Sequence, residues 1–320
     1  MTRPTPPPRP VTHPTRALTR LANWHYPARS TGSGPETVRV TPEQAGWDYA
    51  GLRVVELAPG ATYDLATGDD EVLVLPLAGS CVVEAPFGRA ELAGRRSVFE
   101  ALTDYAYLSR DSPARLASPG GGRFALASAR ARERLPFRHV RAGEVEVELR
   151  GAGSCSRQVN NFGTPAVLDA DRLIACEVLT PAGNWSSYPP HKHDQQRPGE
   201  TELEEIYYFE VAPGPAGPGV GYQRAYGTAE RPADVLAEVR SGDVVVIPHG
   251  WHGPSMAAPG YDLYYLNVMA GPGRREWLVC DDPAHSWVRA SWAGQPVDPR
   301  LPMTELPTTG LPITGGGRRP

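Results

Sequence analysis

Short runs of apolar residues, many with polar residues at every second position, recur along most of this chain. Leu52–Leu57 alternates, Glu71–Leu77 is mostly apolar, and Val145–Leu149 alternates again. Successive side chains of a β-strand point to opposite faces, so alternation predicts half-buried strands and an apolar run predicts a strand buried on both faces. Glycine and proline separate the runs at intervals of roughly ten residues, a spacing typical of β-sandwiches and β-barrels.

The second half of the chain continues this pattern. Further strands are predicted at Leu173–Leu179, Glu205–Val211, Val220–Tyr226, Asp243–Ile247 and Tyr261–Val268. Helical periodicity is scarce, whereas glycine (34) and proline (35) are abundant, which favours an all-β protein.

A faint internal repeat predicts two similar barrels. The strand–turn–strand pattern of Leu75–Glu84 resembles that around Tyr207–Val220. We therefore expect an N-terminal barrel at residues 22–135 and a C-terminal barrel at residues 136–297. The Pro-rich residues 1–21 and the Pro/Gly-rich residues 298–320 are expected to be a disordered and a flexible tail.

Composition narrows the classes of protein that fit. The 320 residues are 40% hydrophobic and 21% charged with a net charge of −4, and no basic stripe indicates a nucleic-acid partner. No apolar run approaches the ~20 residues of a membrane helix. Four scattered cysteines without a C-x-x-C pair predict free thiols, and no secretory signal is visible, so a cytoplasmic location is expected. A homo-oligomer is compatible with this composition.

The strongest chemical signal is the pair of histidines in Pro189-Pro-His-Lys-His-Asp194. In an extended strand His191 and His193 project to the same face, where two imidazoles can bind one metal ion. The alternative is that the two histidines lie in a surface loop and bind no metal. A glutamate at the entry of the following strand could complete the shell, but Glu204 and Glu205 point to opposite faces, and the pattern alone does not choose between them.

A second motif strengthens the metal hypothesis. Gly242–His252 contains a glycine turn, an apolar strand and then Pro248-His-Gly250-Trp-His252. The proline and glycine favour a turn that directs His252 toward the sheet, whereas His249 is expected to point away. Three imidazoles and one carboxylate suit a divalent transition metal, zinc first, with manganese, iron, nickel or cobalt as alternatives.

These two motifs together resemble the two metal-binding motifs of the cupin superfamily. The first motif departs from the pattern by an insert at residues 194–203. The resemblance implies a bicupin, with two tandem jelly-roll-like barrels. Because the first half has no histidine between Tyr26 and Arg138, its barrel is expected to lack a metal site.

Several segments read together are similar to the 5-deoxy-glucuronate isomerase family of myo-inositol catabolism. They are Asn184–Asp194, Glu202–Tyr208, Tyr261–Pro272 and Asp281–Trp287, with Glu43–Trp47 and Gly94–Glu100 in the first half. A sister group, the uronate ketol-isomerases of pectin breakdown, has its glutamate ligand directly before the aromatic strand. Carried over to this chain, that position selects Glu205.

The resemblance implies an aldose–ketose isomerase that converts 5-deoxy-D-glucuronate to 5-dehydro-2-deoxy-D-gluconate through an enediol(ate). The metal would act as a Lewis acid, and a base must move the proton. Asp262, Tyr264 and Glu177 are candidates for that base because they lie on predicted strands near the metal. Arg157 and Arg224 are candidates for binding the substrate carboxylate, with surface ion pairs as the alternative.

Two other functions fit the same residues. A cupin dioxygenase would use iron and O₂ at this site, and a sugar-binding or sensor cupin would bind without turnover. Oxygen consumption separates the first from an isomerase. Metal occupancy without turnover of any uronate separates the second.

Overall fold

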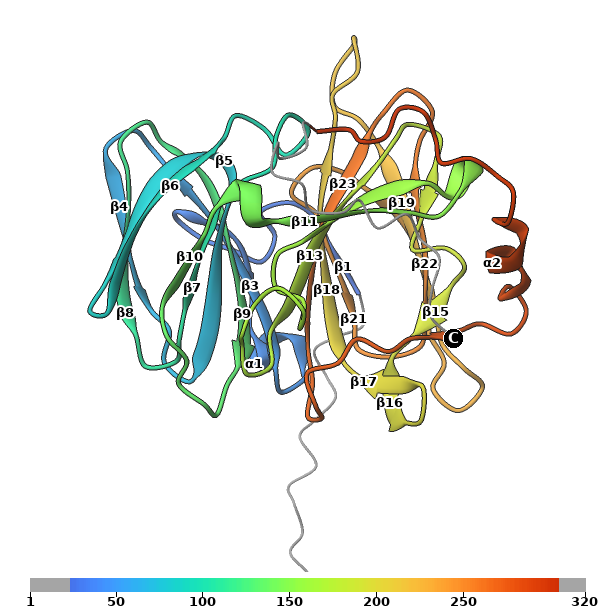
Figure 1. The fold of residues 1–320 in the computed structure, drawn as a ribbon, viewed down its shortest axis with the longest axis horizontal. Coiled ribbons are helices and arrows are strands. Elements are labelled where there is room, and N and C mark those ends of the chain that lie inside the picture. Colours follow the sequence, from blue (N-terminus) through green and yellow to red (C-terminus); the bar gives the residue numbers. More distant parts are fainter. Residues whose placement is uncertain (1–23, 305–320) are drawn as a thin grey trace, which may run out of the picture.

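The computed structural model describes residues 24–304, and its regular secondary structure is almost entirely β-strands arranged as two barrels, which confirms the all-β prediction (Figure 1). The two helices are single turns, α1 (Pro42–Ala45) and α2 (Trp287–Ser291), and two 3₁₀ turns are η1 (Ala142–Glu144) and η2 (Gly153–Cys155). No helix among residues 24–304 has the length and apolar character needed to cross a membrane.

The N-terminal barrel is formed by one nine-stranded sheet. Its strands are β2 (Glu36–Val40), β3 (Ala50–Leu57), β4 (Ala61–Ala66), β5 (Asp70–Ala85), β6 (Gly88–Arg95), β7 (Tyr105–Leu108), β8 (Pro113–Ser118), β9 (Gly122–Arg130) and β10 (Arg138–Val140). The long strand β5 pairs with β7 and β9 at its start and with β6 and β8 at its end, so it belongs to both walls of the barrel.

The C-terminal barrel has two larger sheets and a hairpin. One sheet contains β1 (His25–Tyr26), β21 (Val244–Ile247), β18 (Glu204–Val211), β23 (Leu263–Ala270), β13 (Ile174–Thr180), β12 (Arg157–Asn161) and β11 (Glu146–Arg150). The other contains β20 (Asp234–Val239), β19 (Gly221–Tyr226), β22 (Trp251–Ala257), β15 (His191–Lys192), β24 (Cys280–Asp281) and β14 (Trp185–Ser186). The hairpin is β16 (Asp194–Arg197) with β17 (Glu200–Glu202).

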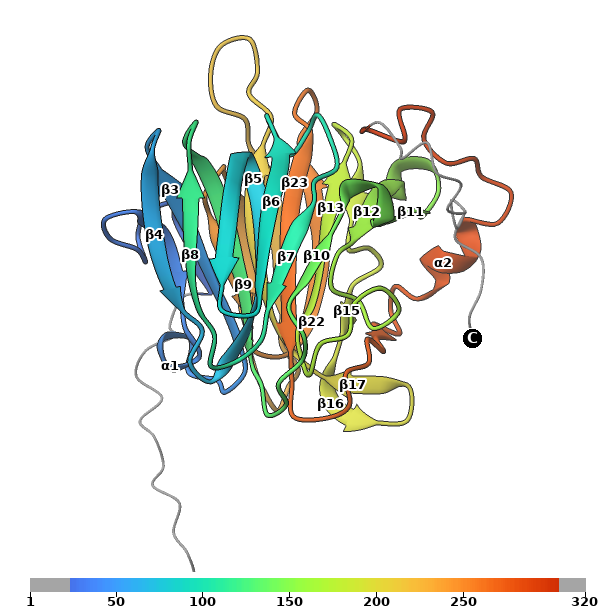
Figure 2. The ribbon, with the colours of Figure 1, turned by 60° about the vertical axis from the view of Figure 1, so that its left-hand side comes forward.

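The two barrels are built in the same order, as the faint sequence repeat predicts. The N-terminal sheet runs β7-β5-β9-β3-β2 and the C-terminal sheet runs β21-β18-β23-β13-β12. These equivalent sheets pack against each other in the middle of the molecule, where they form one shared hydrophobic core (Figures 1 and 2). Each central strand therefore has one face toward the shared core and one face toward the inside of its own barrel.

A matching pair of glutamates, Glu71 and Glu204, joins the barrels. Glu71 near the start of β5 accepts hydrogen bonds of 2.6–2.8 Å from the amides of residues 171–173, which precede β13. Glu204 at the start of the equivalent strand β18 accepts hydrogen bonds of 2.7–2.9 Å from the amides of residues 48–50, at the start of β3. Each carboxylate thus satisfies three backbone donors of the other barrel, which fixes the two barrels in register.

The predicted domain division is crossed by two short strands. β1 belongs to the N-terminal part of the chain but pairs with β21, and β10 lies after residue 135 but pairs with β7. No single boundary in the sequence therefore separates the strands of one barrel from those of the other. The division at residues 135/136 remains a prediction for the rest of the chain.

The predicted tails fall mostly outside the described residues. The expected disordered segment at residues 1–21 lies outside them, as do residues 305–320. Residues 298–304 are packed rather than loose, because Thr304 accepts a 2.8 Å hydrogen bond from the Gln158 side chain and Leu301 is buried. A Pro- and Gly-rich composition therefore did not keep this part of the tail away from the barrel.

Candidate metal centre

Four predicted ligands meet inside the C-terminal barrel. His191 lies on β15, His193 follows it, Glu205 lies on β18 and His252 on β22. Oε2 of Glu205 is 3.0 Å from Nε2 of His193 and 2.9 Å from Nε2 of His252. The His191 ring centroid is 4.6 Å from that of His252. Strands of two different sheets thus bring residues 61 positions apart in sequence to one point.

The geometry of this cluster fits a metal ion. Ligand atoms ~2.1 Å from a metal ion lie roughly 3.0–3.4 Å apart in octahedral or tetrahedral geometry, close to the separations of the Glu205 and histidine atoms. His193, Glu205 and His252 are buried, and their ligand atoms lie within 4.8 Å of one another. Nε2 of His252 is buried 2.9 Å from Oε2 of Glu205 but forms no well-aligned hydrogen bond with it, and a metal ion bound by both atoms would satisfy them.

Backbone carbonyls orient all three imidazoles. Nδ1 of His191 lies 3.2 Å from the Pro189 carbonyl oxygen, Nδ1 of His193 3.2 Å from that of Leu203, and Nδ1 of His252 3.3 Å from that of Gly250. An Nδ1–H donated to a carbonyl leaves Nε2 as the lone-pair nitrogen, which is the usual arrangement of metal-binding histidines.

The charges of the cluster are strongly coupled. Burial would raise the pKa of Glu205, but His252 and His193 outweigh it and hold that pKa well below its usual range. Burial and the neighbouring imidazoles His252 and His193 lower the pKa of His191 well below its usual value. Metal binding requires an ionised carboxylate and neutral imidazoles, and the shifts of Glu205 and His191 are in that direction. Burial lowers the pKa of His193, but its hydrogen bond to Glu205 outweighs burial and raises that pKa.

The two adjacent glutamates have different surroundings. Glu205 faces the histidines, and its Oε1 accepts a 2.6 Å hydrogen bond from the Asn267 side chain. Glu204 faces the other barrel and accepts the three amide hydrogen bonds described above, although burial raises its pKa to about 7. Of the two, therefore, only Glu205 lies against the imidazoles.

The insert between His193 and Glu205 forms the β16–β17 hairpin. Lys192 is buried and donates 2.6 Å hydrogen bonds to Asp194 and Glu200, while Asp194 also accepts from the amide of Gly250. Burial would raise the pKa of Asp194, but the hydrogen bonds from Lys192 and the Gly250 amide outweigh it and lower that pKa to about 2. The ionised Asp194 thus ties the loop of His193 to the loop of His252.

Sequence reasoning missed a row of polar groups that extends the site. The Ser187 hydroxyl lies 3.2 Å from that of Tyr207 and 3.1 Å from that of Tyr265, all three buried. Tyr207 and Tyr265 share strand faces with Glu205 and Asn267, respectively, since they stand two residues away. Extending the face of Glu205 along β18 would have found Tyr207. No comparable signal points to Asn267 or Ser187.

The three candidate bases are not brought to the histidines. Glu177 is fully buried on the opposite face of the sheet, where Arg95 of the N-terminal barrel donates to it at 2.6 and 2.8 Å. Tyr264 lies on that same face, under the Arg95 guanidinium. Asp262 accepts a hydrogen bond from the Ala182 amide beyond the far end of β23. Strand alternation therefore directs Glu177 and Tyr264 into the contact between barrels.

The two candidate arginines are placed differently. Arg224 lies on the outward face of β19, where it pairs with the exposed Asp234 at 2.5 Å. Arg157 is 5% exposed and stands on β12 in the same alternation as Val159 and Asn161. Val159 is paired with Val178, which faces the inside of the barrel with Tyr265. Only Arg157 therefore faces the interior that holds the histidines.

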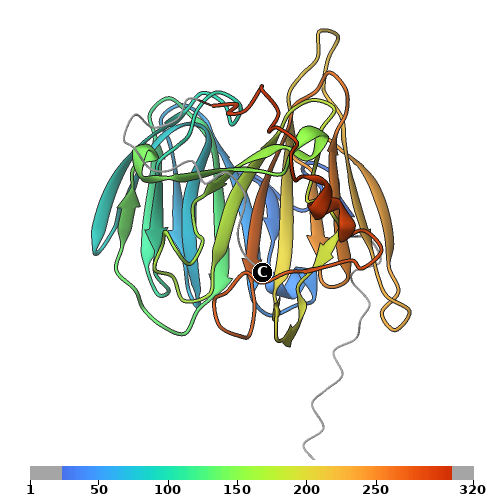
Figure 3. The same ribbon diagram turned by 45° about the vertical axis from the view of Figure 1, so that its right-hand side comes forward.

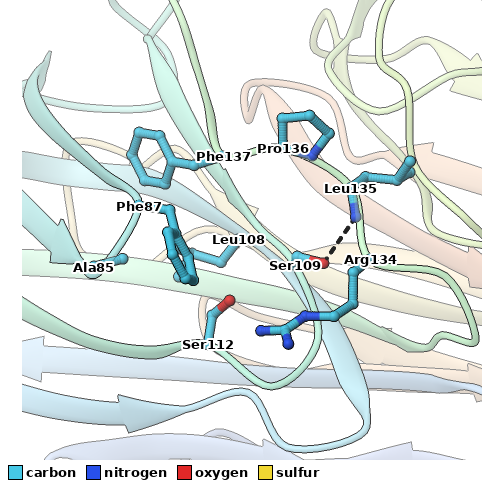
Figure 4. A pocket seen from close by; sticks show the side chains of 9 residues that line it. All are labelled: Ala85, Phe87, Leu108, Ser109, Ser112, Arg134, Leu135, Pro136 and Phe137. Atoms are coloured by element: carbon cyan, nitrogen blue, oxygen red, sulfur yellow. Dashed lines mark hydrogen bonds between the residues drawn. The ribbon is translucent and has the colours of Figure 1, made fainter.

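A pocket on the N-terminal barrel contains none of these residues. Its volume is about 330 Å³, and Figure 4 shows its lining residues, including Phe87, Leu108, Leu135 and Phe137. The lining is largely apolar, and Ser109 there accepts a hydrogen bond from the Leu135 amide. The pocket offers no group for acid–base or metal chemistry.

Comparison with known proteins gives a consistent result. The model of the KduI/IolB family matches residues 24–288. The chain is 42% identical over 268 residues to the 5-deoxy-glucuronate isomerase of Geobacillus kaustophilus, which covers 83% of this chain and 95% of that protein. It is 38% identical over 252 residues to the 5-deoxy-glucuronate isomerase of Bacillus subtilis strain 168, which covers 78% and 91%.

Solved structures show the same fold. An IolB-like protein from Salmonella typhimurium LT2 superposes with a TM-score of 0.77 at 35% identity and covers 83% of this chain and 99% of its own. An oxalate decarboxylase of Lactobacillus farciminis superposes with a TM-score of 0.59 at 13% identity and covers 82% and 89%. The second likeness concerns the bicupin fold alone, which was the predicted architecture.

Proposed function

Since the chain belongs to the KduI/IolB family, we propose that it is an aldose–ketose isomerase that converts 5-deoxy-D-glucuronate to 5-dehydro-2-deoxy-D-gluconate with the help of one divalent metal ion. The observation that carries the proposal is the buried His193–Glu205–His252 cluster, with His191 beside it, in a chain 42% identical to a 5-deoxy-glucuronate isomerase. Zinc is the metal we propose first, because three imidazoles and a carboxylate suit it.

His191, His193, Glu205 and His252 would hold the metal, which supplies Lewis-acid stabilisation of the negative charge that develops on the substrate oxygens. Asn267 would keep Glu205 oriented through the 2.6 Å hydrogen bond to its Oε1. The hydroxyls of Tyr207, Ser187 and Tyr265 can hydrogen-bond to substrate hydroxyls, because each can act as donor or acceptor.

Arg157 would bind the carboxylate of the substrate. It is buried, faces the barrel interior and forms no ion pair with any carboxylate of residues 24–304. Within residues 24–304 its guanidinium donates one hydrogen bond, from Nη1 to the Cys155 carbonyl oxygen at 3.0 Å. A buried guanidinium left without an anion is costly, and a bidentate carboxylate would offset that cost.

The test is turnover of 5-deoxy-glucuronate by the purified chain after metal removal and reloading. We expect the protein stripped by a chelator to be inactive, and zinc, manganese, iron, nickel or cobalt, added singly, to restore formation of the ketose, followed by proton NMR. Full turnover by the stripped protein would refute metal dependence. No turnover with any metal would refute the isomerase.

An oxygen electrode in the same assays separates an isomerase from a dioxygenase on this site. We expect no oxygen consumption, because isomerisation moves a proton between adjacent carbons and needs no oxidant. Oxygen uptake that matches substrate loss would replace the isomerase by an oxidative enzyme.

A further inference from the structure

The charge around Arg157 is unbalanced by one positive unit. Arg150 faces Arg157 across the β11–β12 ladder and is paired with Glu148 at 2.6 Å. Arg289 of α2 is paired with Asp281 of β24. Three guanidinium groups thus share two carboxylates, and the group without a partner is the most deeply buried one, Arg157.

Trp292 lies between two of these arginines. The guanidinium carbon of Arg157 is 5.7 Å from the Trp292 ring centroid, and that of Arg289 is 5.4 Å from it. The ion pair with Asp281 keeps Arg289 at the ring, and Asp281 is itself paired through the backbone with His191. The segment after the last barrel strand therefore forms a wall beside Arg157, on the side of the C-terminal barrel that faces away from the N-terminal barrel (Figures 1 and 3).

Several buried polar atoms in this part of the barrel have no hydrogen-bond partner among the described residues. They are Nε1 of Trp292, Nε1 of Trp277, whose ring lies under Arg150, and Oδ1 of Asn161, a residue 7% exposed. Asn161 stands on the same face of β12 as Arg157. An unpaired cation, unpaired N–H donors and an unpaired carbonyl on one barrel are the groups that a polyhydroxylated anion would satisfy.

Arg157 and the metal cluster face the same barrel interior. Asn161, on the face of Arg157, is paired with Cys176 of β13, and Cys176 is paired with Asn267 of β23, which donates to Glu205. Arg157 stands four residues before Asn161, roughly 13 Å along β12. A ligand in this interior would therefore have the cluster on one side and the arginines on the other.

We propose that Arg157 and the indole N–H of Trp292 form an anion subsite for the carboxylate end of the substrate, and that Arg289 acts as the positioning residue for Trp292. Arg157, Trp292 and Arg289 then determine selectivity for sugar acids over neutral sugars. This assignment rests on the proposed function for the identity of the substrate. Arg289 and Trp292 lie beyond residue 288, where the family match ends.

The test uses two acyclic probes that the enzyme cannot isomerise, D-gluconate and its uncharged counterpart sorbitol, titrated calorimetrically into the metal-loaded chain. We expect gluconate to bind more tightly than sorbitol. Arg157→Gln should weaken gluconate binding on the order of 100-fold, and Trp292→Phe, which keeps the ring but removes the N–H, roughly tenfold. Sorbitol binding should change little in either variant.

Trp287→Phe is the matched control, because Trp287 begins the helix α2 that Trp292 caps but is 65% exposed. It should bind both probes like the wild type. Equal binding of gluconate and sorbitol by the wild type, or an equal effect of Trp287→Phe and Trp292→Phe, would overturn the subsite. Gluconate that binds only by chelating the metal would be unaffected by Arg157→Gln, which also overturns it.

Two further readouts separate this inference from its alternatives. If Arg157 had only a structural role, Arg157→Gln would lower the melting temperature, whereas loss of an unpaired buried charge should leave it unchanged or raise it. If the chain turns over 5-deoxy-glucuronate, Trp292→Phe should raise KM by the same tenfold with kcat nearly unchanged. If Trp292→Phe turns over 5-deoxy-glucuronate with an unchanged KM, the subsite is refuted but the isomerase is not. If the chain prefers gluconate to sorbitol but turns over no 5-deoxy-glucuronate, the isomerase is refuted but the subsite is not.

Discussion

The two barrels have the same strand order, but their interiors differ in chemistry. On β9 of the N-terminal barrel the inward positions are Phe124 and Leu126, which belong to an entirely apolar cluster. On the equivalent strand β23 of the C-terminal barrel the inward positions include Tyr265 and Asn267. The sheets that face each other in the shared core are apolar on both sides, apart from the buried glutamates and their partners.

This difference shows that the barrel determines where side chains meet and that the inward residues determine what they do. Apolar side chains fill the N-terminal barrel and stabilise it by burial. Buried histidines, a carboxylate and an unpaired arginine give no such gain and cost desolvation. Among the described residues, a buried cluster of histidines and a carboxylate occurs in one barrel only, which indicates that a ligand, rather than folding, accounts for it.

The largest effect is expected from removing a metal ligand. In His252→Ala the barrel keeps its sheets but loses an imidazole that contributes to the metal shell, so we expect bound metal to disappear and kcat/KM to fall at least about 1000-fold. Metal content by mass spectrometry and turnover of 5-deoxy-glucuronate measure both changes.

His249→Ala is the matched control for this substitution. His249 lies three residues earlier, packs edge-on against Trp24 and is not part of the cluster. It should retain metal and activity. If the two variants lose metal equally, the loss reflects damage to the loop rather than a missing ligand.

The next effect concerns the ion pair that crosses the shared core. Arg95 and Glu177 are both fully buried, so Glu177→Leu leaves an unpaired charge between the barrels. We expect the free energy of unfolding in urea to fall by about 3–5 kcal/mol. The double variant Arg95→Met/Glu177→Leu should regain most of that stability. A double variant as unstable as the single one would show that packing, and not the unpaired charge, causes the loss.

The contents of the metal centre were largely predictable from the sequence, whereas the faces of the central strands were not. The motifs around His191, His193 and His252 contain their own turn signals, and family resemblance selected Glu205. Glu177 and Tyr264, however, lie on strands that are buried on both faces. In such strands alternation separates two sets of residues but does not say which set faces the shared core.

Long-range pairing accounts for the rest. Glu204 and Glu205 are adjacent acids, and the backbone amides at residues 48–50 that bind Glu204 distinguish their roles. Likewise Asn267 acquires its contact with Glu205 because β23 and β18 are neighbours in the sheet. Contacts between residues so distant in sequence leave no local pattern that strand periodicity could detect.

A smaller effect is expected from a cavity in the apolar barrel. Leu116 on β8 is fully buried in the N-terminal interior, so Leu116→Ala should lower the free energy of unfolding by roughly 3 kcal/mol. Metal content and the KM for 5-deoxy-glucuronate should remain at wild-type values at a temperature where the variant is folded. A changed KM would mean that the N-terminal interior communicates with the site, which contradicts a purely structural role.

The smallest of these effects should come from Asn267, which touches the proposed ligand shell without belonging to it. Asn267→Ala removes the 2.6 Å hydrogen bond to Glu205 Oε1, so the carboxylate can rotate away from the position in which it faces His193 and His252. Loss of such an orienting group typically weakens metal affinity about 10–100-fold, and competition with a chelator measures that affinity. Leu126→Ala on the equivalent strand β9 is the control: it should lower stability but not metal affinity, because Leu126 packs in the apolar cluster of the other barrel. Unchanged affinity in Asn267→Ala would show that Glu205 is held by the histidines alone, and the polar interior would then matter for substrate rather than for metal.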